Sequence, residues 1–257
     1  MSIELAKSTK LCIIILAAGK GTRKKNPDMA KVMYEINEKP MVYYVLDLAA
    51  KVQACRIVLV VGWKKESVIE YVTKLNPKTE FVDQAQQLGT GHAVLQSSEI
   101  LKDFDGDVLI LSGDVPLLTE ETAKALVGYH RTSGAVATIL TAEFSNPAGY
   151  GRIVRNKDGT VQKIVEDKEA SSTEKVIKEI NSGIYVFEKD RLLESLKLIE
   201  PNNAQGEYYL TDVFKIFWKD NWRVSAVKAL EPLEVMGINT MGQLKEVSEL
   251  IATRSSL

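Results

Sequence analysis

The sequence predicts an α/β fold in which a mostly parallel sheet is flanked by helices on both faces. In the first half of the chain, short apolar runs typical of buried strands alternate with segments of helical periodicity. A loop with two glycines directly follows the first apolar run, at residues 11–17. After about residue 143 the alternation gives way to a hairpin pattern. We therefore expect a single domain over residues 1–257, with sub-regions at about 1–143 and 144–257.

The first sub-region is expected to consist of βα units joined by right-handed crossovers. Leu11 to Ile15 form an unbroken apolar run, which is typical of a strand that is buried on both faces. Strands are predicted at 11–17, 56–61, 80–83, 107–112 and 135–142, and helices at 40–53, 64–75, 91–101 and 120–132. Ligands of such sheets bind at the carboxyl ends of the strands. The glycine loop and Gly113-Asp114 both follow strands, so they should meet at one edge.

The second sub-region is predicted to add a hairpin, a strand and three helices. Gly151–Arg155 and Val161–Glu166 flank the turn-forming pair Asp158-Gly159. A further strand is predicted at Ile180–Phe187, and helices at 190–199, 209–220 and 240–253. No linker rich in Pro, Gly or Ser separates the two sub-regions, and we expect a cleft between them.

Composition argues against several functional classes. The 257 residues carry 33 basic and 34 acidic side chains, without the basic excess that a nucleic-acid-binding surface needs. No run approaches the roughly 20 apolar residues of a membrane span. Cys12 and Cys55 lie in or beside predicted buried strands without the spacing of a metal site, so we expect reduced core thiols. We expect a cytoplasmic protein with no nucleic-acid or membrane partner.

The segment from Leu16 to Arg23 reads Leu-Ala-Ala-Gly-Lys-Gly-Thr-Arg and is predicted to bind phosphate. Gly19 and Gly21 allow the backbone to approach a phosphate and to direct its N–H groups at it. Arg23 and Lys31 add the positive charge that a triphosphate needs. The spacing matches neither of the two common glycine-rich phosphate motifs, which indicates another family of nucleotide-binding proteins.

This loop resembles the signature of sugar-1-phosphate nucleotidyltransferases, and four later motifs narrow the resemblance. They are Gln84–Ala93, Gly113–Leu117, Gly149–Ile153 and Asn203–Asp212, in this order. Together they are similar to the uridylyltransferase domain of the bacterial bifunctional enzymes that make UDP-N-acetylglucosamine, from about Lys10 to the C-terminal helix. The resemblance implies a nucleotide-diphospho-sugar transferase fold, in which a Rossmann-like sheet carries an inserted β-hairpin sub-region that binds the sugar.

The resemblance also implies a reaction. UTP and N-acetylglucosamine 1-phosphate would give UDP-N-acetylglucosamine and pyrophosphate. A sugar phosphate oxygen attacks the α-phosphorus of UTP in line, so the protein must neutralise charge and align the reactants. No general base or covalent intermediate is needed because the phosphate nucleophile is already ionised. The chain has only two histidines, which fits that expectation.

Asp114 is the first candidate metal ligand. It follows an apolar strand within Ser112–Pro116, where a carboxylate can hold Mg²⁺, a cation that favours oxygen ligands and substrate phosphates. The alternative is that Asp114 caps the following helix or fixes the turn. By the resemblance alone, Asn239 in Gly237-Ile238-Asn239 is the second protein ligand, and its alternative is a turn residue.

Arg23 and Lys31 are the candidate catalytic cations. Arg23 is expected to face the β- and γ-phosphates, and Lys31 the phosphates at the reacting centre. The alternative is a solvated basic loop, since other lysines are adjacent. The resembled family places a proline directly before the equivalent of Lys31, where this chain has Ala30, and the loop Lys24–Ala30 is one residue longer. The loop is therefore expected to be less pre-set than in the family.

The loop after the third predicted strand resembles the segment that binds the base. The Gln84 amide can donate and accept, as the imide edge of uracil requires. Backbone groups of Ala18 and Gly89 would complete the recognition, with Thr90 as the N-cap of the next helix. His92 is expected to be a structural helix residue. The nucleotide-binding residues that the resemblance implies are Leu16, Ala17, Ala18, Gly19, Gly21, Thr22, Gln84, Gly89 and Thr90.

The second sub-region supplies the predicted sugar contacts. The substrate-binding residues that the resemblance implies are Gly151, Glu166 and Asn181. A carboxylate accepts hydrogen bonds from sugar hydroxyls, and an amide bonds to hydroxyl or acetamide groups. The alternative is that these residues only shape the hairpin. The Gly206–Tyr209 segment is expected to close one wall of the cleft, with Thr211 or Asp212 starting the next helix.

Two other functions stay open at this point. The same chemistry can act on another sugar 1-phosphate or with dTTP. A protein of this fold can also bind UTP in a regulatory role with weak catalysis, which the altered loop before Lys31 favours. The resembled enzymes carry hexapeptide repeats after this domain, whereas the sequence ends at Leu257 without one, so we expect no acetyltransferase activity. The oligomeric state is expected to be monomer or dimer.

Overall fold

A computed structural model describes residues 10–21 and 29–254. The strands are β1 (Leu11–Leu16), β2 (Glu35–Ile36), β3 (Lys39–Pro40), β4 (Arg56–Val61), β5 (Glu80–Asp83), β6 (Asp107–Ser112), β7 (Ala137–Glu143), β8 (Gly151–Arg155), β9 (Val161–Val165), β10 (Glu179–Glu188) and β11 (Val224–Lys228). The helices are α1 (Met41–Lys51), α2 (Lys65–Leu75), α3 (Thr90–Leu95), α4 (Glu120–Ser133), α5 (Ser172–Lys175), α6 (Lys189–Leu196), α7 (Asp212–Lys219) and α8 (Met241–Arg254), with 3-10 helices η1 (Lys31–Met33) and η2 (Pro232–Val235).

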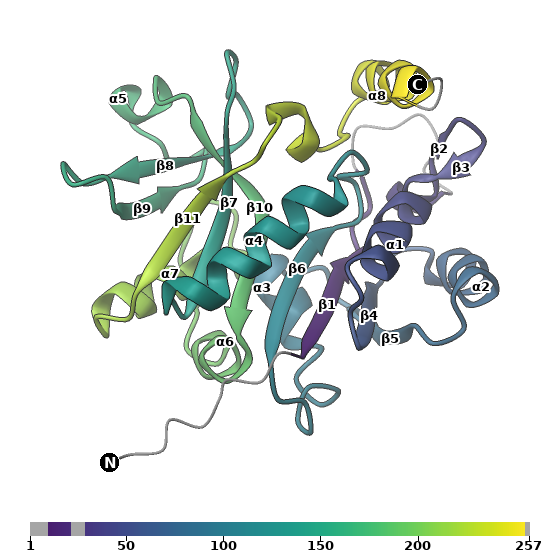
Figure 1. Ribbon diagram of the computed structural model, residues 1–257, viewed down its shortest axis with the longest axis horizontal. Helices are drawn as coiled ribbons and strands as arrows, with labels where there is room; N and C mark the ends of the chain where they lie inside the picture. Colours follow the sequence, from purple (N-terminus) through teal and green to yellow (C-terminus); the bar gives the residue numbers. More distant parts are fainter. Residues whose placement is uncertain (1–9, 22–28, 255–257) are drawn as a thin grey trace.

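A nine-stranded sheet runs through the molecule (Figure 1). Its main path is β11-β7-β10-β6-β1-β4-β5, and the β8–β9 hairpin joins it through β10. β1 pairs in parallel with β4 and β6, and β4 pairs in parallel with β5. β10 is antiparallel to both of its neighbours in the path. The predicted α/β fold with a mostly parallel sheet is confirmed, and strands from both halves of the chain share that sheet.

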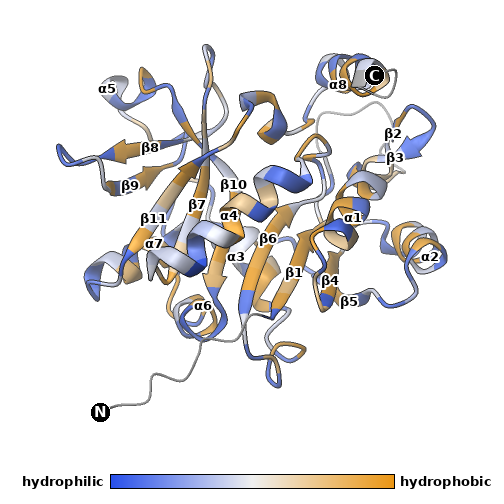
Figure 2. Cartoon of the chain, in the orientation of Figure 1, coloured by the Kyte–Doolittle hydropathy of each residue, from blue (hydrophilic) through white to orange (hydrophobic). Residues whose placement is uncertain are grey.

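Helices cover both faces of the sheet because successive side chains of a strand point to opposite faces. In β1, Ile13 and Ile15 pack with residues of α1, α2 and α4, while Cys12 and Ile14 pack with residues of α3, α6 and α7. The central strands are therefore apolar along their length, whereas the helices are apolar on one side (Figure 2). Burying one such side chain stabilises the folded state by about 1.5–3 kcal/mol. The two clusters together therefore contribute a large part of the stability of the fold.

A third apolar cluster attaches the C-terminal helix. Leu244 and Val247 of α8 pack with Ile36 of β2 and with Ile238. This contact holds the chain segment before α8 close to the end of β6.

Among the residues that the structure describes, no helix combines the length and the apolar character that crossing a bilayer requires.

Strand β10 changes partners half-way. Its first residues pair with β8, where Asn181 lies opposite Gly151, and its last residues pair with β6. The register against β7 shifts between Asn181 and Tyr185, and Gly183 in this stretch has a φ of 79°. The irregularity turns the strand so that the hairpin lies beyond the carboxyl end of β6. The predicted hairpin is confirmed, with Gly159 in its turn at a φ of 85°.

The structure corrects several predicted elements. β11, the β2–β3 pair and α5 were not predicted, because each is a short element without a clear hydrophobic period. The helix predicted at 91–101 ends at Leu95 and continues as turns. The helix predicted at 209–220 begins at Asp212, because the backbone before it bonds to another loop. Cys55 is exposed rather than part of the core, since it precedes the buried part of β4.

Candidate active site

The candidate site is a cleft at the carboxyl ends of β1, β5 and β6. Three adjoining cavities have volumes of about 300, 520 and 300 Å³, and each pair of them shares one lining residue out of Lys31, Glu166 and Glu207. The site residues predicted from sequence that line the cleft are Leu16, Ala17, Ala18, Gly19, Gly21, Lys31, Gln84, Gly89, Thr90, Asp114, Gly151, Glu166, Asn181 and Asn239. Thr22 and Arg23 lie outside the described residues.

Close backbone packing brings the ends of β1 and β6 together. Gly113 N donates to Leu16 O at 2.9 Å. A Cβ atom at Gly113 would lie 2.9 Å from Val32 and 3.0 Å from the Leu16 carbonyl oxygen, so this position accepts only glycine without movement. The carboxylate of Asp114 is thereby delivered to the edge where the glycine loop begins.

Lys31, Asp114 and Asn239 converge at the centre of the cleft. Lys31 Nζ donates to Asp114 Oδ2 and, at 2.8 Å, to Asn239 Oδ1. The backbone carbonyl of Asp114 accepts from Ile238 N at 2.9 Å, which holds the segment that carries Asn239 beside the end of β6. The alternative that Asp114 caps the next helix is wrong, because Thr119 is the N-cap of α4 and its side chain accepts from Thr122 N.

The donor set at this point fits Mg²⁺. Asp114 and Asn239 present a carboxylate oxygen and an amide oxygen, and both contact the ammonium group of Lys31, so the point attracts positive charge. Among the described residues, no cluster of three or more His, Cys, Asp and Glu side chains could hold a metal by itself. Two protein oxygens, with substrate phosphates and water as the other ligands, are a usual arrangement for Mg²⁺.

Packing supplies the constraint on Lys31 that a proline would have supplied. Ala30 has φ −61° and ψ 142°, which is the conformation that proline imposes. Ala30 is fully buried and Lys31 opens η1. Gly21, at a φ of 67°, lies so close that a Cβ there would be 3.1 Å from Lys31 Cβ. The lysine is therefore held between the glycine loop and the two oxygen donors.

Gln84 organises the loop that is predicted to bind the base. The side chain is 4% exposed, and its Nε2 donates to Gly89 O at 2.9 Å and lies 3.1 Å from His92 Nδ1. Gln87 Nε2 donates to Gln84 O at 2.9 Å. The amide nitrogen of Gln84 is therefore engaged in contacts within the protein. The side-chain oxygen of Gln84 is the atom that can accept a hydrogen bond from an imide N–H. His92 also contacts Gln96 and acts as a structural residue of α3.

The loop from Leu88 to Gly91 is bonded to the segment before α7. Tyr208 N donates to Leu88 O, and Gly91 N donates to Tyr208 O, both at 2.8 Å. Leu210 N donates to Thr90 Oγ1 at 3.0 Å, so Thr90 is not the N-cap of α3 as predicted; Gly89 takes that position. These bonds close one wall of the cleft with the Gly206–Tyr209 segment.

The residues that are predicted to contact the sugar lie close to one another. A Cβ on Gly151 would lie 3.4 Å from Asn181 Cβ and 3.5 Å from Glu166 Oε2. Asn181 Nδ2 donates to Tyr185 Oη at 2.7 Å, and Glu166 Oε1 accepts from Thr211 Oγ1 at 2.8 Å. The three predicted residues therefore form one polar wall with a narrow gap at the glycine.

The ionised carboxylate of Glu166 lowers the free energy of unfolding. Burial raises the pKa of its carboxyl above the ordinary value of 4.5, against a smaller lowering effect of the Thr211 hydroxyl. At pH values well below 4.5 the carboxyl is protonated in both the folded and the unfolded chain, so it does not change the free energy of unfolding. As the pH rises past that value the unfolded chain ionises first, so the folded chain loses stability until its own pKa is passed.

We predict that Glu166→Gln raises the thermal stability of the protein at neutral pH. Glutamine keeps an acceptor oxygen for Thr211 and cannot ionise. The difference in Tm between the variant and the unaltered protein should shrink as the pH falls toward 4.5, which thermal scans over that range would measure. A Tm difference that is independent of pH would contradict the buried-carboxyl explanation.

Several lining residues were not predicted as site residues. They include Gln87, Ser112 and Gln205, whereas Glu207 and Tyr209, which also border the cleft, belong to the segment that was expected to close its wall. Each lies inside or beside one of the motifs quoted from the sequence, so motif membership was the available signal. Their individual orientation depends on the pairing of loops and has no signature of its own.

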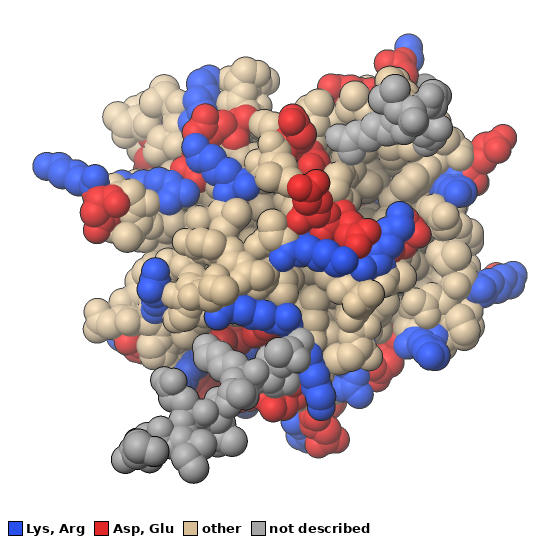
Figure 3. All heavy atoms as spheres, in the orientation of Figure 1, with Lys and Arg blue, Asp and Glu red and all other residues tan. Residues whose placement is uncertain are grey.

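The charges of the cleft suit a phosphate ligand. Lys20, Lys31 and Lys168 line its largest cavity, together with Glu166 and Asp167. Lys20 Nζ lies 4.8 Å from the centroid of the Trp63 ring. On the face shown in Figure 3, basic and acidic side chains lie interspersed, as expected for a chain with a net charge of −1.

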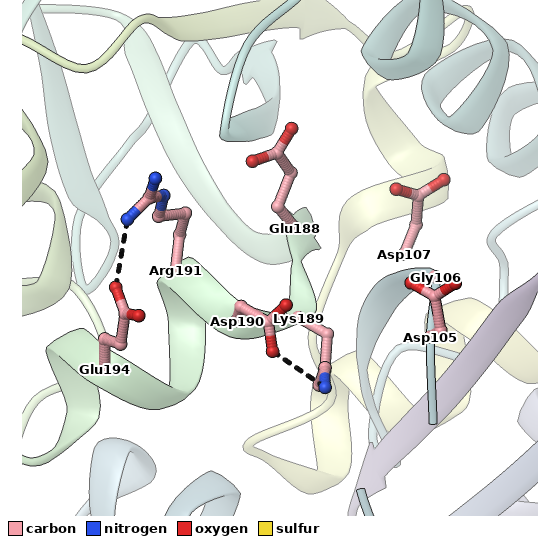
Figure 4. A pocket seen from close by; sticks show the side chains of 8 residues that line it. All are labelled: Asp105, Gly106, Asp107, Glu188, Lys189, Asp190, Arg191 and Glu194. Atoms are coloured by element: carbon pink, nitrogen blue, oxygen red, sulfur yellow. Dashed lines mark hydrogen bonds and ion pairs between the residues drawn. The ribbon is translucent and has the colours of Figure 1, made fainter. Parts of the chain in front are cut away.

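A separate hollow at the opposite edge of the sheet does not suit a nucleotide. It lies where β6 begins and β10 ends (Figure 4), and its lining is Asp105, Gly106, Asp107, Glu188, Lys189, Asp190, Arg191 and Glu194. Acidic side chains outnumber basic ones, and both basic side chains pair with neighbours, Lys189 with Asp190 at 2.7 Å and Arg191 with Glu194 at 3.1 Å. A polyphosphate would be repelled there.

Comparison with known proteins decides the family. A model described as nucleotidyl transferase matches residues 12–231. The chain belongs to the nucleotidyl transferase family. The matched range contains every described residue of the cleft named above except Asn239.

This nucleotidyltransferase has curated relatives of greater length. It is 47% identical over 244 residues to the bifunctional protein GlmU of Pelotomaculum thermopropionicum, covering 95% of this chain and 52% of the relative. It is 48% identical over 244 residues to the protein of the same name from Acetivibrio thermocellus, with the same shares covered. The chain therefore spans about half the length of the relatives it matches.

A solved structure shares the fold of this nucleotidyltransferase. UDP-glucose pyrophosphorylase complexed with UDP-glucose superposes with a TM-score of 0.76 at 18% identity. The similarity covers 96% of this chain and 100% of the other. It supports the nucleotide-diphospho-sugar transferase fold that the resemblance implied.

Proposed function

We propose that the protein transfers uridylyl from UTP to N-acetylglucosamine 1-phosphate, giving UDP-N-acetylglucosamine and pyrophosphate. The observation that carries this proposal is the meeting of Lys31, Asp114 and Asn239 at the point where the cavities of the cleft adjoin. The identity to the bifunctional GlmU proteins supports the choice of base and sugar.

The chain's own residues bind and align two anions. Lys31 is placed to neutralise phosphate oxygens at the reacting centre, and the backbone of Gly19 and Gly21 can approach the triphosphate. The attacking phosphate oxygen is already ionised, so no side chain has to remove a proton. Holding both phosphates in line in a cleft removes much of the entropic part of the barrier.

Asp114 and Asn239 would hold Mg²⁺ through their side-chain oxygens. When bound, such a cation would supply positive charge that neutralises substrate phosphates and polarises the phosphorus centre. Lys31 lies beside these two oxygens, where its ammonium group can also contact a substrate phosphate. The oxygen-only donor set and the cation that it already attracts support this assignment.

The two sub-regions divide the recognition. Residues 1–143 supply the base and triphosphate contacts, with Gln84 and the backbone of Gly89 facing the uracil edge. Residues 144–257 supply the sugar contacts through Gly151, Glu166 and Asn181, and also the second metal ligand. Arg23 belongs to the proposed triphosphate contacts on the resemblance alone.

A panel of substrates tests the proposal. Turnover of UTP, dTTP and the other nucleoside triphosphates would be compared with N-acetylglucosamine 1-phosphate and with other hexose 1-phosphates at saturating Mg²⁺. We expect the highest kcat/KM for UTP with N-acetylglucosamine 1-phosphate. A different pair that is more than about tenfold better, equivalent to about 1.4 kcal/mol, would overturn the substrate assignment and leave the chemistry in place.

A further inference from the structure

Thr211 occupies a helix N-cap position without capping the helix. A threonine there usually accepts a hydrogen bond from a backbone N–H of the first turn. In this chain Thr211 has φ −63° and ψ −17°, and its side chain makes no cap bond to α7. Its hydroxyl donates to Glu166 Oε1 at 2.8 Å, across 45 positions of the sequence. The hydroxyl therefore contacts a residue of the cleft and does not cap the helix.

The hydrogen bond from Thr211 occupies one carboxylate oxygen of Glu166 and leaves the other oxygen facing the cleft. Oε1 is held by Thr211, while Oε2 is the oxygen nearest Gly151 on the sugar-side wall. The terminal torsion of a glutamate is intrinsically broad, so an unheld carboxylate would rotate. Thr211 is 9% exposed and lines the same cavity as Glu166.

Several charged and titratable groups surround this carboxyl. Glu169 and Asp212 act on it unfavourably, and Lys215 favourably. Tyr185 on β10 and Tyr209 before α7 also face it. Burial raises the pKa of Glu166 while the Thr211 hydroxyl lowers it, so this hydroxyl favours the ionised, accepting form.

We propose that Thr211 is a positioning residue that fixes Glu166 Oε1, so that Oε2 accepts a hydrogen bond from a hydroxyl of the sugar 1-phosphate. The inference rests on the proposed function. It assigns Thr211 to discrimination of the sugar substrate and gives it no part in nucleotide binding.

Two substitutions test the role of Thr211. Thr211→Val keeps the shape and removes the donor, and Thr211→Ser keeps the donor. With Mg²⁺ and UTP saturating, Thr211→Val should raise the KM for N-acetylglucosamine 1-phosphate by about tenfold or more and leave the KM for UTP within about twofold, since the lost bond is one to a charged group. Thr211→Ser should restore the KM. The acidic limb of kcat/KM should move to higher pH in Thr211→Val only.

A control separates positioning from stability. Thr119→Val removes a hydroxyl that caps its helix and also donates to Glu234 Oε2 at 2.9 Å, and neither residue lines the cleft, so it should lower the Tm without raising the KM for the sugar phosphate. Equal increases of KM in Thr119→Val and Thr211→Val would overturn the inference. So would a Thr211→Ser variant that behaves like Thr211→Val.

A measurement without turnover separates this inference from the proposed function. The pKa of Glu166 can be followed by carbon NMR of the labelled carboxyl in the unliganded protein, and it should rise in Thr211→Val. Absence of turnover in the unaltered protein would contradict the proposed function. An unchanged Glu166 pKa in the valine variant would overturn the role of Thr211 whatever the activity.

Discussion

Replacing Asp114 with alanine is expected to lower kcat by about 10²–10³-fold, the usual cost of removing one preorganised electrostatic contact from a reacting centre. Asp114 is one of the two oxygen donors around Lys31. Its side chain is 21% exposed, and a partly exposed ion pair contributes less than about 1 kcal/mol to stability. The variant should therefore unfold at nearly the same temperature. Pyrophosphate release and a thermal scan on the same preparation measure both effects.

Asp190→Ala is the matched control. Asp190 pairs with Lys189 at 2.7 Å and is 76% exposed on α6, away from the cleft. Its loss should leave kcat unchanged. If Asp114→Ala loses cooperative unfolding together with activity, Asp114 is structural and its proposed part in catalysis is wrong.

Replacing Gly89 with alanine is expected to destabilise the protein by roughly 3 kcal/mol, from backbone strain and overpacking together. Gly89 has a φ of 112°, and a Cβ there would lie 2.5 Å from Tyr208 O and 2.9 Å from Tyr208 N. The clash falls on the backbone that closes the cleft, so UTP affinity should fall as well. Chemical denaturation and calorimetry with UTP measure the two losses.

Gly134→Ala is the control that separates the effect of the steric clash from the effect of the backbone strain. Gly134 follows α4 at a φ of 67°, and nothing lies within 4 Å of a Cβ placed there. Its replacement should cost only about 1–2 kcal/mol and leave UTP binding unchanged. Equal effects of the two substitutions would show that the contact between the Gly89 loop and Tyr208 is unimportant.

The order and direction of the predicted strands indicated that two segments of the cleft meet, while the other site residues followed from the family resemblance. The glycine loop and Gly113-Asp114 follow parallel strands, and such strands end at one edge of the sheet. The hairpin could be read from Asp158-Gly159 and its flanking strands. These features depend on local patterns, and the structure confirms the fold that they predicted.

What each residue touches could not be predicted, because the partners come from distant segments. Thr90 was expected to cap α3, yet its hydroxyl accepts from Leu210 N. Asn239 has no local signal, and it reaches the cleft through the bond between Ile238 N and Asp114 O. Ala30 is buried and has the dihedral angles of a proline, whereas residues 24–28 of the loop that was expected to be less pre-set lie outside the described residues.

The central claim is tested most directly by pyrophosphate release from UTP and N-acetylglucosamine 1-phosphate, measured with Mg²⁺, with EDTA, and after Mg²⁺ is restored. The account predicts release that depends on both substrates, stops with EDTA and returns with Mg²⁺. UTP binding without any release under these conditions would contradict the proposed function and favour a nucleotide-binding protein with little catalytic activity.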